Sequence, residues 1–180
     1  VFGPVSGGHI NPAVTLGMLM LRNIVLRDAV IYWLAQISAA VLSATVLRIG
    51  LGPAARLGGH YPSGSILGSI LMEVSLTFAL LTLIILVVSH QKRLGNISAV
   101  SIGTAIAVGI LIGAPVSGGS MNPARSFGPT AISWSWSNHW VYWVGPLSGA
   151  MLSVLNWLLT KYFINITILR RKNTNPEVQR

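Results

Sequence analysis

GPVSGGHINPA at Gly3–Ala13 returns further along the chain as APVSGGSMNPA at Ala114–Ala124. The two copies share the Pro-Val-Ser-Gly-Gly run and the closing Asn-Pro-Ala, and an apolar stretch follows each. Such a repeat in a strongly apolar chain predicts a duplicated membrane architecture. Asn-Pro also marks a helix start, because Asn caps a helix and Pro favours its first position. We therefore expect two short helices that begin in loops inside a membrane protein, an arrangement that suggests a pore.

The composition supports a membrane protein. Of the 180 residues, 52% are hydrophobic and 8% are charged, whereas about a quarter of the residues of a soluble domain are charged. A bilayer-spanning helix needs roughly 20 apolar residues. Four segments reach that length: Ala29–Leu51, Ile66–Ser89, Ile97–Val116 and Trp140–Thr160. The predicted fold class is all-α, a multi-pass transmembrane helical bundle.

The net charge of +9 follows the membrane topology. Its basic residues lie between the apolar spans or at the end of the chain, whereas a nucleic-acid-binding protein gathers them on one soluble face. We therefore expect no nucleic-acid partner. The Lys92–Arg93 loop and the basic tail are predicted on the cytoplasmic side, with the tail disordered from Arg170. The chain has no cysteine, which excludes disulfides and thiolate metal sites.

The repeat divides the chain into three parts. Residues 1–65 are expected to form the end of a first repeat, 66–165 a second repeat, and 166–180 the tail. Two spans precede the second copy, so symmetry predicts two further spans before the first copy, which this sequence lacks. The short helix predicted at Pro12–Leu21 would be about 15 Å long, half a bilayer. If the two short helices enter from opposite faces, their N-termini meet near the midplane.

The two asparagines, Asn11 and Asn122, are the central candidates for the site. Each is placed to cap a half-helix while its amide offers N–H donors to a solute. The positive ends of both helices would face one point and repel cations. The alternative is that both residues are ordinary caps.

The glycine-rich loops before the asparagines are predicted to turn their backbone carbonyls into the pore as a ladder of acceptors. These loop residues are Ser6, Gly7, Gly8 and His9 in the first copy, and Ser117, Gly118 and Ser120 in the second. Tight turns chosen only for packing are the alternative. His9 is expected to be a packed loop residue, not a metal ligand, because no second ligand lies at suitable spacing.

Two charged residues lie at membrane depth. Arg125 stands where the first copy has Val14, and a lone arginine there usually marks a pathway; snorkelling to the interface is the alternative. Glu73 is the only acid inside a span and should accept hydrogen bonds from loop backbone N–H groups. The alternative for Glu73, a proton relay, would need further acids. His60, His90 and His139 are expected to be solvated or interfacial.

Other patterns concern packing and chemistry. Three Gly-x-x-x-Gly pairs predict close helix contacts, namely Gly64/Gly68, Gly109/Gly113 and Gly145/Gly149. A hydrolase triad, a phosphate-binding loop and a metal cluster are all missing from the sequence. We therefore expect neither an enzyme nor a cofactor.

These residues resemble the aquaporin family, also called major intrinsic proteins. The resemblance rests on the two Asn-Pro-Ala boxes, Asn11-Pro12-Ala13 and Asn122-Pro123-Ala124, and on the buried glutamate at Glu73. It extends over Ser6–His9, Asn122–Gly128 and Asn138–Trp143, and nearly the whole chain is covered. It implies an inverted repeat, a passive water channel that excludes protons and ions, and a homotetramer in a lipid bilayer.

The resemblance also implies a selectivity filter. Arg125 matches the family's filter arginine, Ile110 takes a place that is histidine in strict water channels, and Gly119 takes the third position. The fourth position falls on a helix that this sequence lacks. The resulting wide filter is similar to that of plant vacuolar channels, which indicates a plasma or internal membrane such as the vacuolar one.

Three further functions stay open. A broader facilitator would pass ammonia, glycerol or hydrogen peroxide, although Ser126 stands where glycerol facilitators carry Asp. A non-conducting membrane scaffold would follow if the leading spans were truly absent. An ion transporter would need paired intramembrane charges, which the sequence lacks.

Overall fold

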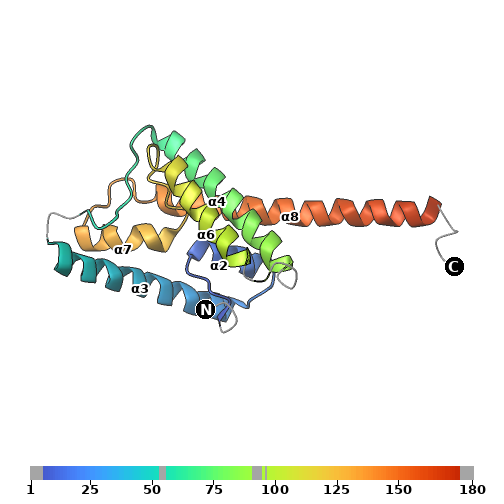
Figure 1. The fold of residues 1–180 in the computed structure, drawn as a ribbon, viewed down its shortest axis with the longest axis horizontal. Coiled ribbons are helices and arrows are strands. Elements are labelled where there is room, and N and C mark those ends of the chain that lie inside the picture. Colours follow the sequence, from blue (N-terminus) through green and yellow to red (C-terminus); the bar gives the residue numbers. More distant parts are fainter. Residues whose placement is uncertain (1–5, 53–55, 91–94, 96, 175–180) are drawn as a thin grey trace.

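The computed structural model describes residues 6–52, 56–90, 95 and 97–174, with side chains up to residue 167, and every regular element in these ranges is a helix. Lys92, Arg93 and the residues from 175 onward lie outside the described residues. The helices form one bundle, from which the last helix projects (Figure 1). They are α2 (Pro12–Met20), α3 (Leu26–Leu51), α4 (Ile66–Ser89), α6 (Ile97–Gly113), α7 (Pro123–Ser133) and α8 (Val141–Thr174).

Three helices are long and apolar enough to cross a membrane: α3, α4 and the Val141–Thr167 part of α8. The apolar helix α6 has 17 residues, at the lower end of spanning length (~17 residues). The prediction that this span reaches Val116 is wrong, because α6 ends at Gly113. The backbone N–H groups of Val116, Ser117 and Gly118 all bond the carbonyl of Gly113, and Pro115 has no N–H with which to continue the helix.

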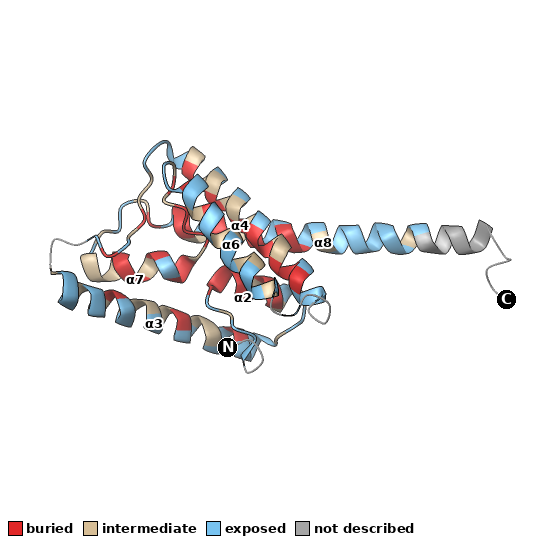
Figure 2. Cartoon of the chain, viewed as in Figure 1, coloured by how far each residue is buried: buried red, intermediate tan, exposed pale blue. Residues whose placement is uncertain are grey.

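The last helix is longer than predicted. α8 runs for 34 residues, to Thr174, so the predicted disorder is wrong for residues 170–174. At 1.5 Å per residue α8 measures about 50 Å, well beyond the roughly 30 Å hydrocarbon core of a bilayer. Figure 2 shows that its first half contributes buried residues while the described residues further along are mainly exposed. The helix is therefore longer than a single membrane crossing requires.

The two short helices occupy the centre of the bundle. α2 has 9 residues and α7 has 11, which makes them about 14 and 17 Å long, half a bilayer each. α2 lies against α3 and α8, while α7 lies mainly against α3. In Figure 1, α7 extends to the left and α2 to the right of their meeting point. The predicted half-helices are confirmed.

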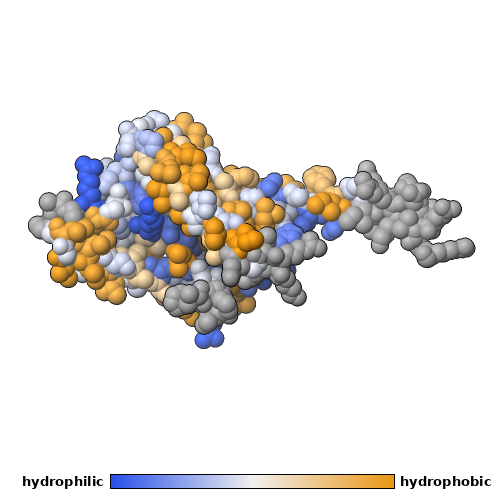
Figure 3. Space-filling model, viewed as in Figure 1, coloured by the Kyte–Doolittle hydropathy of each residue, from blue (hydrophilic) through white to orange (hydrophobic). Residues whose placement is uncertain are grey.

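The core joins the first short helix to its neighbours. Figure 2 shows the buried residues converging where α2, α4 and the start of α8 meet. In contrast, the outer surfaces of α4 and α6 are apolar and exposed, and polar residues gather in the recess beside α7 (Figure 3). This is the pattern of a helix bundle in lipid. The core cluster contains Ala13, Val14, Met18, Leu80, Leu81, Ile84, Ile85, Met121, Ala150 and Val154.

Two glycines of α8 allow this helix to pack closely against α4. A Cβ on Gly145 would lie 2.6 Å from Cβ of Glu73, and one on Gly149 would overlap the carbonyl oxygen of Val74. The pair Gly109/Gly113 likewise faces Met121 and Gly119. These two predicted pairs are confirmed. The Gly64/Gly68 prediction is wrong, because nothing lies within 4 Å of a Cβ at Gly64 and only the Ser65 hydroxyl lies near one at Gly68.

We expect Gly149→Ala to lower the stability of the protein by about 1–3 kcal/mol, because the added methyl group must push α4 and α8 apart. Thermal unfolding in detergent, followed by tryptophan fluorescence, measures this loss. The matched control is Gly103→Ala in α6, where nothing lies within 4 Å of the added Cβ. A midpoint that falls equally in both variants would contradict the packing argument.

Candidate pore-loop site

Both asparagines cap their half-helices. Oδ1 of Asn11 accepts a hydrogen bond from the backbone N–H of Ala13 at 2.9 Å. Oδ1 of Asn122 accepts from the backbone N–H groups of Ala124 at 3.1 Å and Arg125 at 3.3 Å. Proline follows each asparagine as the first helical residue. The caps predicted from the sequence are confirmed.

The same two side chains join the two copies of the repeat. Nδ2 of Asn11 donates to the carbonyl of Met121 at 2.7 Å, and Nδ2 of Asn122 donates to the carbonyl of Ile10 at 3.0 Å. We call this pair of bonds the reciprocal clasp. It places the N-termini of α2 and α7 at the same point, as predicted. Each amide has two N–H hydrogens, so the clasp occupies only one of them.

Glycine gives both loops the same unusual backbone. Gly7 and Gly8 have φ of +74° and +67°, and Gly118 and Gly119 have φ of +89° and +64°. L side chains rarely adopt these angles, which explains why both copies carry Gly-Gly. The repeat therefore encodes a loop shape as well as a helix start.

The predicted carbonyl ladder is partly occupied by the protein itself. The carbonyl of Ser6 accepts a hydrogen bond from the Tyr32 hydroxyl, and that of His9 accepts one from Nε2 of Gln36 at 2.8 Å. In the second loop the carbonyl of Ser117 accepts from the Tyr142 hydroxyl at 2.7 Å. Within the described part of the chain, no donor reaches the carbonyls of Gly7, Gly8 and Gly118.

Glu73 holds the second loop from inside the bundle. Its carboxylate is fully buried and accepts hydrogen bonds from the backbone N–H groups of Ser120 at 2.8 Å and Met121 at 2.7 Å. The Ser117 hydroxyl donates a third bond at 2.8 Å. Met121 has a left-handed backbone with φ of +54°, which is costly for a side chain with Cβ. The prediction that Glu73 accepts loop N–H groups is confirmed.

The three predicted filter residues that this sequence contains lie together. Arg125 is exposed, and its Nη1 donates to the carbonyls of Gly119 at 2.8 Å and Ser120 at 3.3 Å. Gly119 is buried against α6, where a Cβ would come within 3.0 Å of the Ile110 Cα. The guanidinium is thus fixed by the loop that precedes its own helix. A side chain at Gly119 would press against the Ile110 backbone and would also have to adopt the φ of +64° that favours glycine.

Two residues of α3 support the first loop, and sequence reasoning missed both. Nε1 of Trp33 donates to the carbonyl of Pro12 at 3.1 Å. Gln36 is buried, and its Nε2 donates to the His9 carbonyl and, at 3.0 Å, to the Thr15 hydroxyl. A glutamine inside an apolar span was the available signal, because a polar group there needs a partner.

Two histidines contradict the expectation of solvated or interfacial side chains. His60 is 5% exposed and His139 is 6% exposed. Nδ1 of His60 lies 3.1 Å from the Ser126 hydroxyl, and Nδ1 of His139 lies 3.1 Å from the Thr130 hydroxyl. Both partners are on α7, one turn apart. Burial, and to a smaller extent the nearby charge of Arg125, lowers the pKa of His60 to about 3.

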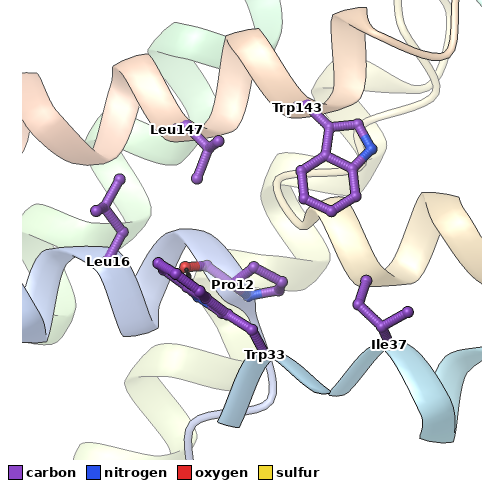
Figure 4. A pocket seen from close by; sticks show the side chains of 6 residues that line it. All are labelled: Pro12, Leu16, Trp33, Ile37, Trp143 and Leu147. Carbon is purple, nitrogen blue, oxygen red and sulfur yellow. Dashed lines mark hydrogen bonds between the residues drawn. The ribbon is translucent and has the colours of Figure 1, made fainter. Parts of the chain in front are cut away.

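An apolar pocket of about 240 Å³ lies between α2, α3 and α8 (Figure 4). Both indole N–H groups in its lining are already used, since Trp33 bonds Pro12 and Nε1 of Trp143 donates to Nε2 of His139 at 3.0 Å. The pocket therefore offers no polar side-chain partner to a solute. Its lining residues are Pro12, Leu16, Trp33, Ile37, Trp143 and Leu147.

Comparison with known proteins agrees with this arrangement. A family model described as "Major intrinsic protein" matches residues 1–157. The chain belongs to this family. It is 45% identical over 154 residues to "Probable aquaporin TIP3-2" of Arabidopsis thaliana, covering 84% of this chain and 58% of that protein. It is 39% identical over 166 residues to "Aquaporin TIP1-1" of the same plant, covering 91% and 65%.

A solved structure shows the same fold. The aquaglyceroporin of Plasmodium falciparum superposes with a TM-score of 0.73 at 24% identity, covering 85% of this chain and 72% of that one. The chain spans about three fifths of the length of the plant relatives. Together with the three apolar spans, the family makes this chain an integral membrane protein. The resemblance to the tonoplast-intrinsic type, drawn from the sequence, is confirmed by these relatives.

We expect Glu73→Gln to destabilise the second loop of this family member by about 1–3 kcal/mol, because an amide NH₂ replaces an acceptor oxygen opposite backbone N–H groups. Hydrogen exchange at the Ser120 and Met121 amides should accelerate. The control is Asp28→Asn, the same chemical change at an exposed position on α3. Equal exchange in the two variants would show that the carboxylate does not hold the loop.

Stability should also fall as the pH is lowered from 6.5 towards 3. In this window the imidazole of His60 stays neutral in the folded protein, with a pKa of about 3, whereas the unfolded chain takes up a proton near 6.5. The unfolded state therefore binds more protons, and acid favours it. Thermal midpoints measured across this range should fall less steeply in His60→Asn. Identical slopes in the wild-type protein and in His60→Asn would refute the assignment.

Proposed function

We propose that the full-length protein is a passive channel that conducts water across a membrane and excludes protons and ions. The observation that carries this proposal is the reciprocal clasp between Asn11 and Asn122, which brings two helix N-termini together beside glycine-rich loops. The free amide hydrogens of both asparagines would donate to a passing water. The open carbonyls of Gly7, Gly8 and Gly118 would accept from it.

The charge distribution supports selectivity for neutral molecules. Each half-helix places roughly half a positive elementary charge at its N-terminus. The guanidinium of Arg125, fixed on two carbonyls, adds a full positive charge nearby. Cations and hydronium are repelled there, whereas a neutral molecule that accepts hydrogen bonds is not; this is the general mechanism of aquaporin-type channels.

The composition of the filter favours a second candidate, a broader facilitator for ammonia, glycerol or hydrogen peroxide. Ile110 offers no polar side-chain group and Gly119 no side chain, so Arg125 supplies the charged donors of the filter. Width at this point would admit solutes larger than water. A non-conducting membrane scaffold is a third candidate, which transport measurements separate from both channels.

The setting of the channel belongs to the same proposal. Similarity to proteins named TIP aquaporins supports a vacuolar membrane, and the family supports a homotetramer with one pore per subunit. We further propose that residues 1–65 complete a first repeat, that 66–165 form the second, and that 166–180 extend into the cytoplasm. Water, small neutral solutes and the lipid bilayer are then the partners of the protein.

The test is osmotic shrinkage of liposomes that contain the full-length protein. Faster shrinkage in sucrose than in empty liposomes supports a water channel. Reswelling in glycerol, or a rapid internal pH rise with ammonia, supports the broader facilitator. Shrinkage no faster than in empty liposomes would overturn both channel proposals and leave the scaffold.

We expect Arg125→Val to raise glycerol permeability relative to water by about tenfold, because the position loses its fixed cation and adopts the Val14 residue of the first copy. The glycerol-to-water permeability ratio measures the change. The control, Arg27→Val, removes an exposed arginine at the start of α3. A ratio unchanged in Arg125→Val would remove Arg125 from the filter.

A further inference from the structure

A chain of buried hydrogen bonds connects the segment between α3 and α4 to the second Asn-Pro-Ala box. Nδ1 of His60 lies 3.1 Å from the Ser126 hydroxyl, which lies 2.5 Å from the Ser120 hydroxyl. The Ser120 hydroxyl donates to the backbone carbonyl of Asn122 at 2.9 Å. All three side chains are at most 5% exposed. We call this chain the serine relay.

The direction of the relay follows from counting hydrogens. A serine hydroxyl has one hydrogen, and that of Ser120 is used on the Asn122 carbonyl. The Ser126 hydroxyl must therefore donate to Ser120, which leaves it only an acceptor role towards His60. His60 consequently carries its proton on Nδ1, and its Nε2 keeps a lone pair.

The relay ends on groups that the proposed filter uses. Ser120 donates its N–H to Glu73, and its carbonyl accepts from Arg125. Asn122 donates to Ile10 in the reciprocal clasp. The relay thus adds a third restraint to a loop held from the inside by Glu73 and from the outside by Arg125.

The ring of His60 is held in place by its packing against neighbouring residues. Its ring lies against the second loop, where a Cβ on Gly118 would come within 3.0 Å of the His60 Cδ2. The ring also faces Tyr142, with 5.7 Å between ring centroids. These contacts fix the ring so that Nδ1, and not Nε2, points at Ser126.

We propose that His60 is a positioning residue of the second Asn-Pro-Ala box, acting through its Nδ1–H and the serine relay to set the selectivity at Arg125. The proposal rests on the proposed channel function for its transport readout. It assigns a functional role to the segment between α3 and α4, which lies outside both Asn-Pro-Ala motifs. Loss of the relay removes one restraint on Ser120, so that its backbone carbonyl, an acceptor for the Arg125 guanidinium, is held less firmly.

The first experiment does not depend on transport. Nitrogen NMR of the full-length protein, labelled at histidine and compared with His60→Asn for assignment, reports which ring nitrogen of His60 carries the proton. We expect protonated Nδ1 and bare Nε2, and in Ser126→Ala a change in the Nδ1 signal. Protonated Nε2 in the wild-type protein would overturn the relay.

The second experiment measures the glycerol-to-water permeability ratio in liposomes. Ser126→Ala and His60→Ala should each raise the ratio about threefold to tenfold, the factor that one lost buried hydrogen bond supports. His60→Asn should restore a near wild-type ratio, because its amide nitrogen lies close to the position of Nδ1. The double variant His60→Ala/Ser126→Ala should match the single variants, since both break the same relay.

The matched control is His139→Asn. His139 is equally buried and also bonds a hydroxyl of α7, but its partner Thr130 lies one turn beyond Ser126 and has no link to the box. The glycerol-to-water permeability ratio of His139→Asn should stay at the wild-type value. An unchanged ratio in Ser126→Ala, or additive effects in the double variant, would overturn the positioning role. Absence of any water flux in the wild type would instead defeat the channel proposal, while the NMR result still decides the relay.

Discussion

A helix that begins inside a membrane leaves its first backbone N–H groups without partners within the helix, and this constraint shapes the centre of the molecule. Asn11 and Asn122 each satisfy this constraint with the oxygen and the nitrogen of the side-chain amide. The oxygen caps the residue's own helix, while the nitrogen holds a carbonyl of the opposite loop. Neither half-helix can therefore move without breaking the restraint on the other, so the two copies act as a single unit.

The second loop is also held between two opposite charges. The carboxylate of Glu73 takes backbone N–H groups of Ser120 and Met121, while the guanidinium of Arg125 takes the carbonyls of Gly119 and Ser120. The peptide dipoles of the loop thus point from one charge to the other, which stabilises both charges as well as the loop. The hydrogen bond from the Met121 N–H group to Glu73 also offsets the free-energy cost of the left-handed backbone at Met121. A buried acid is explained by the loop it holds, without any proton transfer.

Much of this centre could be predicted from the sequence because its chemistry is local. Asn-Pro encodes a cap, and the lone buried acid had to find loop N–H groups. The supports from outside the motifs could not be predicted in the same way. His60 and His90 are the same residue type in neighbouring connections, yet one is buried and the other exposed. Which one meets the Ser126 hydroxyl depends on how α4 and α7 are placed, and no local pattern encodes that.

The two copies share their backbone geometry but differ in the surroundings of the residue that follows each Asn-Pro-Ala box. Val14 is buried in the core cluster against α4 and α8, whereas Arg125, at the matching position, is exposed and turned back onto its own loop. A valine there serves packing, because an arginine in that core would carry an unpaired charge. The Val14 position of the first half-helix is therefore a packing position. The duplication supplied two equal helix ends, and the surrounding helices determined which end could carry a charged side chain.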